Sequence, residues 1–457
     1  MDACDITGLP PAAGGAAEGA RARGLRGAPG WLPGALAAGA AVPLALLGAG
    51  RPPAEGGLLL RVLAVAAAAF LFSFALTPLA ARLARRLGIL DVPDARKIHA
   101  RPTPLLGGAA VFLGFLAGVL GAGEASPQLA AMLTAAFVLF VAGVFDDRRE
   151  IAAAVKLFVQ ALCTLMVMAS GIVLRVLPAA WGPWSEAGNG LLTFLWIVGL
   201  TNAFNFFDGM DGLAAGLGVL IASFLAAAAF QSAAPAAGWV AVALAGGCLG
   251  FLPFNFRPGK AAAVFLGDAG STVIGFVLAT LAVHGEWSEN RPLVSFLCPI
   301  LIFWVPIFDM VHITCDRILS GKVRSFRGWI EYVGRDHLHH RLADLLGSRS
   351  LAVATILLLS AGFGLNALVL RETAAAGVAL LCAQSVLFVV GVTILERRGR
   401  RTIAAQNGGR LAVAETAAIP PADGARAAGP SGPGAAPGVI CRKTRRGDQK
   451  MGVEGAP

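Results

Sequence analysis

The sequence predicts an all-α polytopic integral membrane protein, and three observations carry that prediction. Hydrophobic residues make up 56% of the 457 residues, and charged residues only 14%. The mean hydropathy is +0.72. Mostly apolar runs of about 20 residues, the length that crosses a bilayer, recur along the chain. A soluble domain of this length would carry more charge and shorter, periodic apolar runs.

The apolar runs predict about eleven transmembrane helices, each near the length that a bilayer requires. In chain order, the predicted spans are 58–82, 105–123, 128–145, 153–175, 189–207, 212–231, 237–254, 268–284, 293–315, 351–370 and 374–395. The Ala- and Gly-rich stretch 31–50 is a further candidate, although a signal-like segment, a loosely inserted helix or disorder fits it equally well.

The predicted spans form one polytopic domain, 57–396, between two regions of low complexity. Residues 1–56 are rich in Gly, Ala and Pro. The basic tail 397–457 has no apolar periodicity, so we expect it to be disordered. The seven cysteines are scattered with no CxxC pair, which argues against a disulfide framework or a zinc ribbon.

The net charge of +10 follows a membrane pattern rather than that of a nucleic-acid-binding protein. Lys and Arg cluster on alternate connections, at 82–101, 148–156, 257–260, 317–349 and 397–401. The opposite connections carry only Arg175, Arg291 and Arg371. Because basic connections stay on the cytoplasmic side, we expect the basic loops and the C-terminus there. The bilayer is then the expected partner, and nucleic acid is not.

Acidic residues gather on the same side of the predicted membrane, at the ends of spans. They are Asp146 and Asp147 in "VFDDRR", Asp208 and Asp211 in "FFDGMDG", Asp268 in "FLGDAGS", and Asp309 and Asp316 near the end of 293–315. Carboxylates are costly in hydrocarbon and usually face a polar cavity or a partner. Mg²⁺ takes one or two protein carboxylates and fills its shell with phosphate oxygens and water. Carboxylates beside Lys and Arg therefore suit a Mg²⁺-bound diphosphate.

Each acidic motif also has a simpler structural explanation. Asp146 and Asp147 beside Arg148 would suit a solvated helix end. The stretch "DGMDG" would suit an ordinary Asx or Gly turn, and Asp268 could cap the following helix. Their common depth on one side of the membrane favours a shared site over three unrelated structural roles.

Two basic loops add hydrogen-bond donors on the predicted cytoplasmic side. The motif "GRDHLHHRL" contains His337, His339, His340 and Arg341. We interpret these residues as a phosphate-binding or proton-carrying group, with a zinc site or a loop against anionic headgroups as the alternatives. The stretch "DVPDARKIHARPTPLLGG" offers Arg96, Lys97 and His99. These donors suit phosphate oxygens, the alternative being an ordinary membrane-surface loop.

Taken in order, five motifs resemble those of the polyprenyl-phosphate N-acetylhexosamine-1-phosphate transferases. They are "DVPDARKIHARPTPLLGG", "VFDDRR", "NAFNFFDGMDGLAAG", "FNFRPGKAAAVFLGDAGS" and "DHLHHRL", which together cover about 91–345. The set looks most like the bacterial branch that starts O-antigen, enterobacterial common antigen or teichoic-acid linkage synthesis. The related phospho-MurNAc-pentapeptide transferases usually carry consecutive histidines followed by Phe-Glu. Here Leu338 interrupts the histidines and Arg341 follows them.

The resemblance implies a multi-pass protein of the bacterial inner membrane whose active site faces the cytoplasm. An oxygen of undecaprenyl phosphate would attack the β-phosphorus of a UDP-amino sugar, with UDP-N-acetylglucosamine as the expected donor. The products would be undecaprenyl-diphospho-sugar and UMP. Mg²⁺, or Mn²⁺ in its place, would be the cofactor.

The resemblance also implies roles for individual residues. Asp146 would assist or deprotonate the lipid phosphate with Asp147 beside it, and Asp268, together with Asp147, would hold Mg²⁺. The implied substrate-binding residues are Arg96, Lys97, His99, Asn202, Asn205, Asp208, Asp211, Lys260, Phe265, His337, His339, His340 and Arg341. Among them, Phe265 would stack on uracil, the residues of 202–211 would line the nucleotide pocket, and the histidine loop would close over the sugar-phosphate.

Three alternatives stay open at this point. A phospho-MurNAc-pentapeptide transferase would run the same chemistry on another sugar. A secondary transporter would hold its site near the membrane midplane between repeated halves, and no repeat is visible here. A non-catalytic polyprenyl-binding protein would not require Asp146, Asp147 and Asp268 together. The stretch "SFRGWIEYVGRD" departs from the family, so the sugar stays open, as does the oligomeric state, for which a homodimer is one arrangement.

Overall fold

The computed structural model describes residues 55–93, 101–232, 234–257, 260–285, 287, 291–325, 328, 332, 334, 336–373, 377–391 and 393. Three predictions therefore lie outside the described residues. They concern the segment 31–50, the tail 397–457 and the donors Arg96, Lys97 and His99.

Helices dominate the described part of the chain, as the sequence predicts. They are α3 (Glu55–Leu87), α4 (Gly107–Ala122), α5 (Pro127–Arg148), α6 (Ala153–Ala169), α7 (Pro183–Phe207), α8 (Leu213–Phe230), α9 (Pro235–Asn255), α10 (Asp268–His284), α11 (Pro292–Ile302), α12 (Trp304–Leu319), α14 (Leu338–Leu346) and α15 (Arg349–Glu372). A short 3-10 helix, η1 (Ala179–Trp181), precedes α7, and the antiparallel strands β1 (Leu90–Asp91) and β2 (Thr103–Pro104) follow α3. The predicted all-α polytopic class is confirmed.

Each predicted span contains an apolar helix, but not every helix has the length of a span. Among the described residues, six helices are long and apolar enough to cross a membrane, or seven if one bent pair counts as a span. The helices Gly107–Ala122, Ala153–Ala169, Asp268–His284 and Gly377–Gly391 are apolar but shorter. Helix length and composition therefore support a polytopic protein without fixing the number of crossings.

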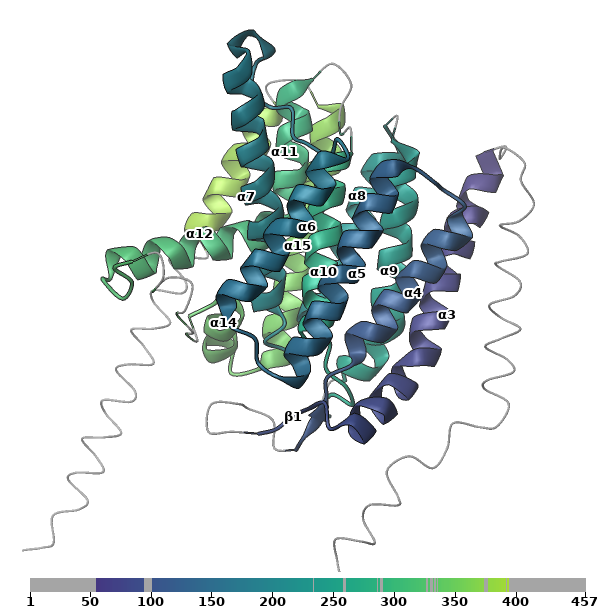
Figure 1. Ribbon diagram of the computed structural model, residues 1–457. Coiled ribbons are helices and arrows are strands. Elements are labelled where there is room, and N and C mark those ends of the chain that lie inside the picture. Colours follow the sequence, from purple (N-terminus) through teal and green to yellow (C-terminus); the bar gives the residue numbers. More distant parts are fainter. Residues whose placement is uncertain are drawn as a thin grey trace, which may run out of the picture. The chain divides into compact units, whose positions relative to one another are not determined.

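The predicted span 293–315 consists of two helices rather than one straight helix. The chain bends by 80° between Leu293–Ile302 and Trp304–Leu319, with Phe303 at the break. Consequently α12 runs out of the side of the helix bundle (Figure 1). Pro299 lies inside α11 and cannot donate a backbone hydrogen bond, and Pro306 lies in the first turn of α12, where proline is tolerated.

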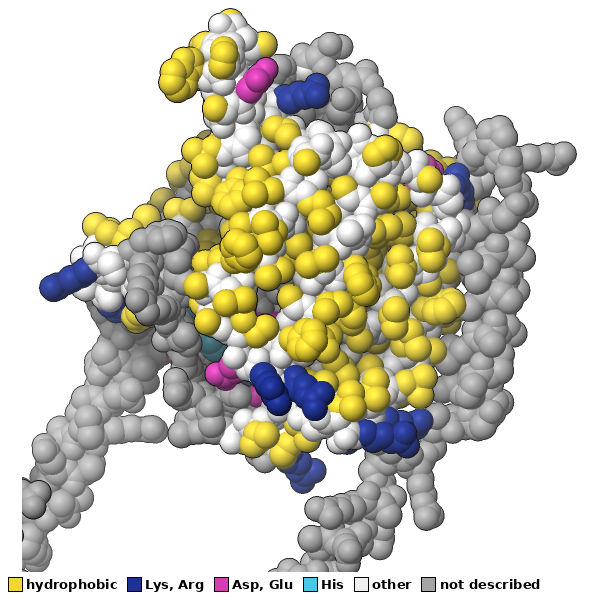
Figure 2. Space-filling view, viewed as in Figure 1, with side chains coloured by type: hydrophobic (Ala, Val, Ile, Leu, Met, Phe, Trp, Pro, Cys, Tyr) yellow, Lys and Arg dark blue, Asp and Glu magenta, His cyan; other side chains and the backbone are white. Residues whose placement is uncertain are grey.

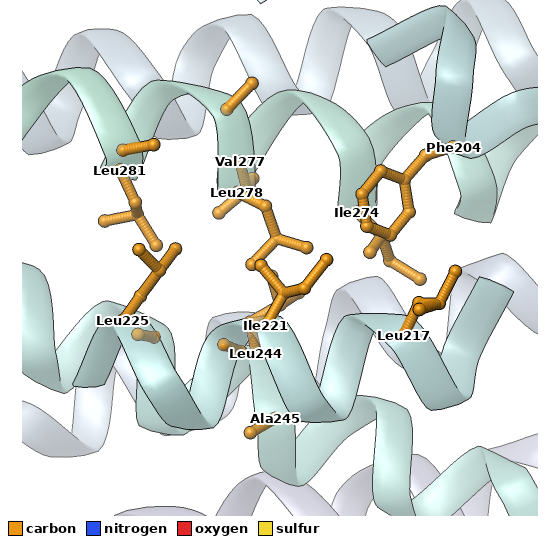
Figure 3. Close-up of a cluster of buried hydrophobic side chains, with 14 of the residues drawn as sticks. Phe204, Leu217, Ile221, Leu225, Leu244, Ala245, Ile274, Val277, Leu278 and Leu281 are labelled. Atoms are coloured by element: carbon orange, nitrogen blue, oxygen red, sulfur yellow. The ribbon is translucent and has the colours of Figure 1, made fainter. Parts of the chain in front are cut away.

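Helix α10 is the packed centre of the bundle. All its residues from Ala269 to Val283 are buried. Figure 3 shows apolar side chains of α10 against those of α7, α8 and α9, including Ile274, Val277, Leu278 and Leu281 against Leu217, Ile221 and Leu225. In lipid, where apolar burial gives little advantage, such close packing is a main source of helix association.

Glycines allow two neighbours to approach the beginning of α10 closely. A Cβ on Gly108 of α4 would lie 2.3 Å from the backbone nitrogen of Gly270, and one on Gly143 of α5 would lie 2.4 Å from the Cα of Ala269. Small residues at membrane helix contacts permit such backbone approach. The beginning of α10 is thereby fixed against α4 and the last turns of α5.

One end of the bundle collects the polar loops. The backbone N–H of Phe265 donates to the carbonyl of Pro104 (2.8 Å), and that of Gly107 donates to the carbonyl of Phe265 (3.0 Å). These bonds join the β2–α4 connection to the segment before α10. Figure 2 shows hydrophobic side chains over the flank of the helices and a group of Lys and Arg side chains at this lower end. The exposed Arg85, Arg86 and Arg148 lie in the last turns of α3 and α5, and the exposed Arg149 directly follows α5.

Candidate active site

Asp147, in the last turn of α5, caps the beginning of α10. Its carboxylate accepts the backbone N–H groups of Asp268 (2.8 Å) and Ala269 (3.3 Å). These donors belong to the first turn of α10, where N–H groups lack helical partners and the helix dipole favours negative charge. Gly267 precedes them at φ +74°, and a Cβ there would lie 2.5 Å from Asp147 Oδ2. The structure thus gives Asp147 a capping role, and its metal role stays a prediction.

Lys156, near the start of α6, joins two of the predicted catalytic carboxylates. Its ammonium lies 2.7 Å from Asp268 Oδ2 and also contacts Asp146 Oδ2. The other oxygen of Asp146 accepts the backbone N–H of Ile151 (2.7 Å). The other oxygen of Asp268 accepts the side-chain amide of Asn205 (2.9 Å). Four helix ends therefore converge on one charged cluster.

A hollow opens beside this cluster, between α5, α6 and α10. It is open to solvent, measures about 360 Å³ with that open space included, and has Asp146, Lys156 and Asp268 in its wall. Leu139, Val155 and Val159 contribute apolar wall. A charged patch next to an apolar wall suits an amphipathic ligand with an anionic head, because each part finds a matching surface.

The junction of α7 and α8 holds the other predicted acidic residues. Asp211 Oδ2 accepts the backbone N–H of Ala262 (3.3 Å), which fastens this junction to the segment before α10. Burial, and then the charges of Asp268, Asp147 and Asp211, raise the pKa of Asp208 well above its ordinary value. The junction therefore lies in the same electrostatic field as the cluster.

Two asparagines near this junction have structural partners. Asn202 donates to Gln160 Oε1 (2.6 Å) and to the carbonyl of Val198 (2.8 Å), which ties α7 to α6. Asn255, at the end of α9, accepts the backbone N–H of Gly212 (2.6 Å) and donates to the carbonyl of Val264 (3.1 Å). The proposed pocket role of Asn202 stays a prediction. Of the two remaining residues in this region, Lys260 is exposed and Phe265 is half-buried.

The histidine motif forms the beginning of α14 and lies against the α7–α8 junction. The ring of His337 stacks on Phe206 with 5.0 Å between centroids, and the rings of His339 and His340 lie 4.2 Å apart. A Cβ on Gly209 would lie 2.8 Å from His339 Nε2. The histidine motif and the "DGMDG" turn are therefore in direct contact.

Two charged groups of the histidine loop have shifted pKa values. Burial would raise the pKa of Asp336, but the hydrogen bonds and charge of Arg317 outweigh it and lower that pKa. The Arg317 guanidinium donates to both Asp336 oxygens, at 2.9 and 2.7 Å. Burial and the neighbouring His340, His337 and Arg341 lower the pKa of His339 well below its ordinary value. His339 is therefore a neutral ring, and both its nitrogens are buried without a hydrogen-bond partner among the described residues.

The carboxylates of the cluster outnumber its cationic groups, so the cluster could accept a further cation. No group of three or more His, Cys, Asp or Glu is arranged to enclose a metal ion within the described ranges. Mg²⁺ uses one or two carboxylates and completes its shell with water and substrate phosphates. Asp146 and Asp268 share a single ammonium, that of Lys156, and Asp147 contacts the backbone of Asp268 beside them. The residues present therefore fit a divalent cation brought together with a phosphorylated substrate.

Three residues without an individual role in the sequence analysis lie in this region; Asp309 was named there only as one of the acidic residues on this side, and Lys156 only as a basic residue of 148–156. Lys156 bridges the two carboxylates, Asn255 fastens the α8 and α10 connections, and Asp309 of α12 contacts His337 Nδ1 at 2.8 Å. The available signal was the presence of Lys156 and Asp309 inside otherwise apolar spans, since a buried charge calls for a partner.

Comparison with known proteins adds a second line of observation. The family model described as glycosyl transferase family 4 matches residues 129–286, which contain Asp146, Lys156, Asn205 and Asp268. A probable undecaprenyl-phosphate N-acetylglucosaminyl 1-phosphate transferase of Bacillus subtilis is 32% identical over 69% of this chain and 86% of its own length.

Two other relatives have similar names. A decaprenyl-phosphate N-acetylglucosaminephosphotransferase of Mycobacterium tuberculosis is 34% identical over 70% of this chain and 84% of its own length. An undecaprenyl-phosphate alpha-N-acetylglucosaminyl 1-phosphate transferase of Escherichia coli is 30% identical over 59% of this chain and 73% of its own length.

Proposed function

Because the chain belongs to glycosyl transferase family 4, we propose that its carboxylate–lysine cluster is the active site of a UDP-dependent sugar-1-phosphate transferase. The resemblance drawn from the five motifs is confirmed at the level of the family. Like its relatives, the chain transfers N-acetylglucosamine 1-phosphate to a polyprenyl phosphate. The donor, the metal and the residue roles below are the proposal.

The proposed reaction has UDP-N-acetylglucosamine as donor and undecaprenyl phosphate as acceptor. An oxygen of the lipid phosphate attacks the β-phosphorus of the donor. The bond between that phosphorus and the bridging oxygen breaks, and UMP leaves with the bridging oxygen. The sugar and its phosphate remain on the lipid as a diphosphate. Sugar-1-phosphate transfer is therefore a single displacement at phosphorus.

The chain's own residues have distinct tasks in this scheme. Asp146 accepts the proton of the lipid phosphate when that phosphate arrives as its monoanion, since its carboxylate lies in the wall of the hollow. Lys156 holds Asp146 and Asp268 in place and offers positive charge to phosphate oxygens. Asp147 keeps the beginning of α10 in position.

Asp268, with Asp146 or Asp147 beside it, would hold Mg²⁺. Bound there, the metal would offset charge on the diphosphate oxygens and on the departing UMP. The neutral His339 and the guanidinium of Arg341 are proposed to meet the sugar-phosphate side, and Phe265 is proposed to stack on uracil.

One observation carries the proposal: a charged cluster of α5, α6, α7 and α10 shares a hollow with apolar side chains. A lipid phosphate requires both surfaces at once. The cluster also lies at one end of the bundle with the basic connections, which supports a cytoplasmic site in the inner membrane. A transporter site would instead lie near the middle of the spans.

The test is UMP release from the purified protein in detergent, supplied with UDP-N-acetylglucosamine, undecaprenyl phosphate and Mg²⁺. We expect release that stops on chelation with EDTA and returns with added Mg²⁺. Asp268→Ala should abolish release, whereas Asp316→Ala, on α12 and outside the cluster, should leave it unchanged. Activity that survives in folded Asp268→Ala protein would contradict the metal-holding role. If the full-length protein releases no UMP from any UDP-amino sugar, the proposal that the donor is a UDP-sugar is contradicted.

A further inference from the structure

Asp309 is a fully buried carboxylate in the middle of α12, with 0% exposure. It follows the 80° bend at Phe303 that turns α12 away from the bundle. Its Oδ2 lies 2.8 Å from His337 Nδ1, and its Oδ1 accepts the backbone N–H of Leu338 at 2.7 Å. An ionised group at this depth is costly unless its oxygens are paired, and here each oxygen has a partner.

The second contact makes Asp309 the cap of α14. His337 is the N-cap residue of this helix, and its side chain makes no capping hydrogen bond. The carboxylate of a different helix therefore takes one of the first N–H groups, which have no partner within α14. The arrangement parallels Asp147 at the beginning of α10. One side chain thus fixes both the ring of His337 and the helix that carries the rest of the motif.

The ring of His337 is held on its other side by the proposed active site. It stacks on Phe206 with an interplanar angle of 27°, and Phe206 lies two residues before Asp208. It is also nearly parallel to the ring of His339, at 16° and 5.7 Å. Both rings are buried, with 6% and 1% exposure. A change at Asp309 therefore reaches the site through His337. The guanidinium of Arg341 also lies 3.9 Å from Asp309 Oδ1, a longer contact whose effect a double-mutant cycle separates from that of the ring.

A carboxylate only accepts hydrogen bonds, so the Nδ1 that faces Asp309 carries a proton. This leaves Nε2 as the ring atom that can receive or pass a proton. Outer partners commonly select the tautomer and orientation of a functional histidine in this way. We propose that Asp309 is the positioning residue of the histidine motif, setting the tautomer and ring orientation of His337 for the sugar-phosphate transfer. This inference rests on the proposed function, because transfer is its readout.

The variant Asp309→Asn separates positioning from folding. Its amide oxygen still accepts the Leu338 N–H, so α14 stays capped. Its amide nitrogen donates towards His337 Nδ1, which then must be unprotonated, so the tautomer reverses. We expect kcat for UMP release to fall by about 10- to 100-fold, the size of effect known for removing the hydrogen-bond partner of a metal-binding histidine, with the KM for the UDP-sugar changed less than twofold. The matched control is Asp316→Asn on the same helix, whose carboxylate pairs with Lys322 at 3.6 Å.

A double-mutant cycle with His337→Ala decides whether Asp309 acts through that ring. We expect the double variant to be no slower than His337→Ala alone, with thermal unfolding of Asp309→Asn close to that of the wild type. Strictly multiplicative losses, or a wild-type kcat in Asp309→Asn, would overturn the proposal. If Asp309→Asn fails to fold, the cycle is run with Asp309→Glu. Wild-type and Asp316→Asn proteins that release no UMP would instead contradict the proposed function.

Discussion

Replacing Lys156 by methionine tests the central feature of the site. Met keeps much of the length of the side chain but removes its ammonium, which contacts both Asp146 and Asp268. The two carboxylates then face each other with no cation between them. The substitution therefore changes the charge of the cluster with little change in packing volume.

The size of the effect follows from the exposure of the three groups. Buried charge-assisted hydrogen bonds contribute about 1.5–3 kcal/mol each. The Lys156 side chain is 36% exposed, against 8% for Asp146 and 31% for Asp268, so solvent screens both contacts and the lower figure applies. Two contacts at about 1.5 kcal/mol give about 3 kcal/mol. At about 1.4 kcal/mol per factor of ten, turnover should fall roughly 100-fold.

The assay is UMP release by purified Lys156→Met, together with thermal unfolding in the same detergent. The matched control is Lys322→Met, which removes an exposed ammonium paired with Asp316 at 3.6 Å. Such exposed pairs are worth about 0–1 kcal/mol, so the control should keep nearly full activity. If folded Lys156→Met protein keeps a turnover within threefold of the wild type, the ammonium of Lys156 does not support turnover as predicted.

Three further predictions follow from single contacts. Gly267→Ala should lower the unfolding temperature more than Gly347→Ala does: both glycines have positive φ, but only at Gly267 would the Cβ meet Asp147, at 2.5 Å. Equal shifts would contradict the importance of that close approach. Gly209→Ala should slow UMP release about tenfold without unfolding the protein, because the added Cβ would lie 2.8 Å from His339 Nε2. The control is Gly199→Ala, whose Cβ would have no neighbour within 4 Å. Similar rates for the two would count against contact between the turn and the histidine motif. Since Arg317 lowers the pKa of Asp336, this pair stabilises the fold above the ordinary Asp pKa of about 3.9 and stops doing so as pH falls through the lowered value. As the pH is lowered from 7 to 3, the unfolding temperature should therefore fall less steeply in Asp336→Asn than in the wild type. Equal slopes for the two proteins would exclude this contribution of the ion pair to stability.

The sequence was most informative where the relevant signal is local. A run of apolar residues is by itself enough to indicate a membrane helix, so the predicted spans coincide with helices from α3 to α15. The bend at Phe303 could not be read in this way, because the apolar run of 293–315 continues through it. A sharp bend depends on a break in the backbone hydrogen bonds of the helix, here close to Pro299, and an apolar run does not report such a break.

The acidic motifs show the same division within the site. The sequence indicated that Asp146, Asp208 and Asp268 share one side, since helices that alternate in direction bring alternate connections to the same end. It could not tell which atoms each carboxylate meets. Asp147 was predicted to hold a metal, yet its oxygens accept backbone N–H groups of α10.

By itself, the sequence determined the membrane class, the gathering of acidic and basic connections at one end of the helices, and the family to which the motifs belong. These properties depend on composition and on order along the chain. Only the tertiary structure decided that Lys156 bridges two carboxylates, one of them 112 residues away, and that Asp309 supports the histidine motif from a bent helix. Such pairings depend on how helices rotate and pack against one another, because hydrogen bonds act over about 3 Å.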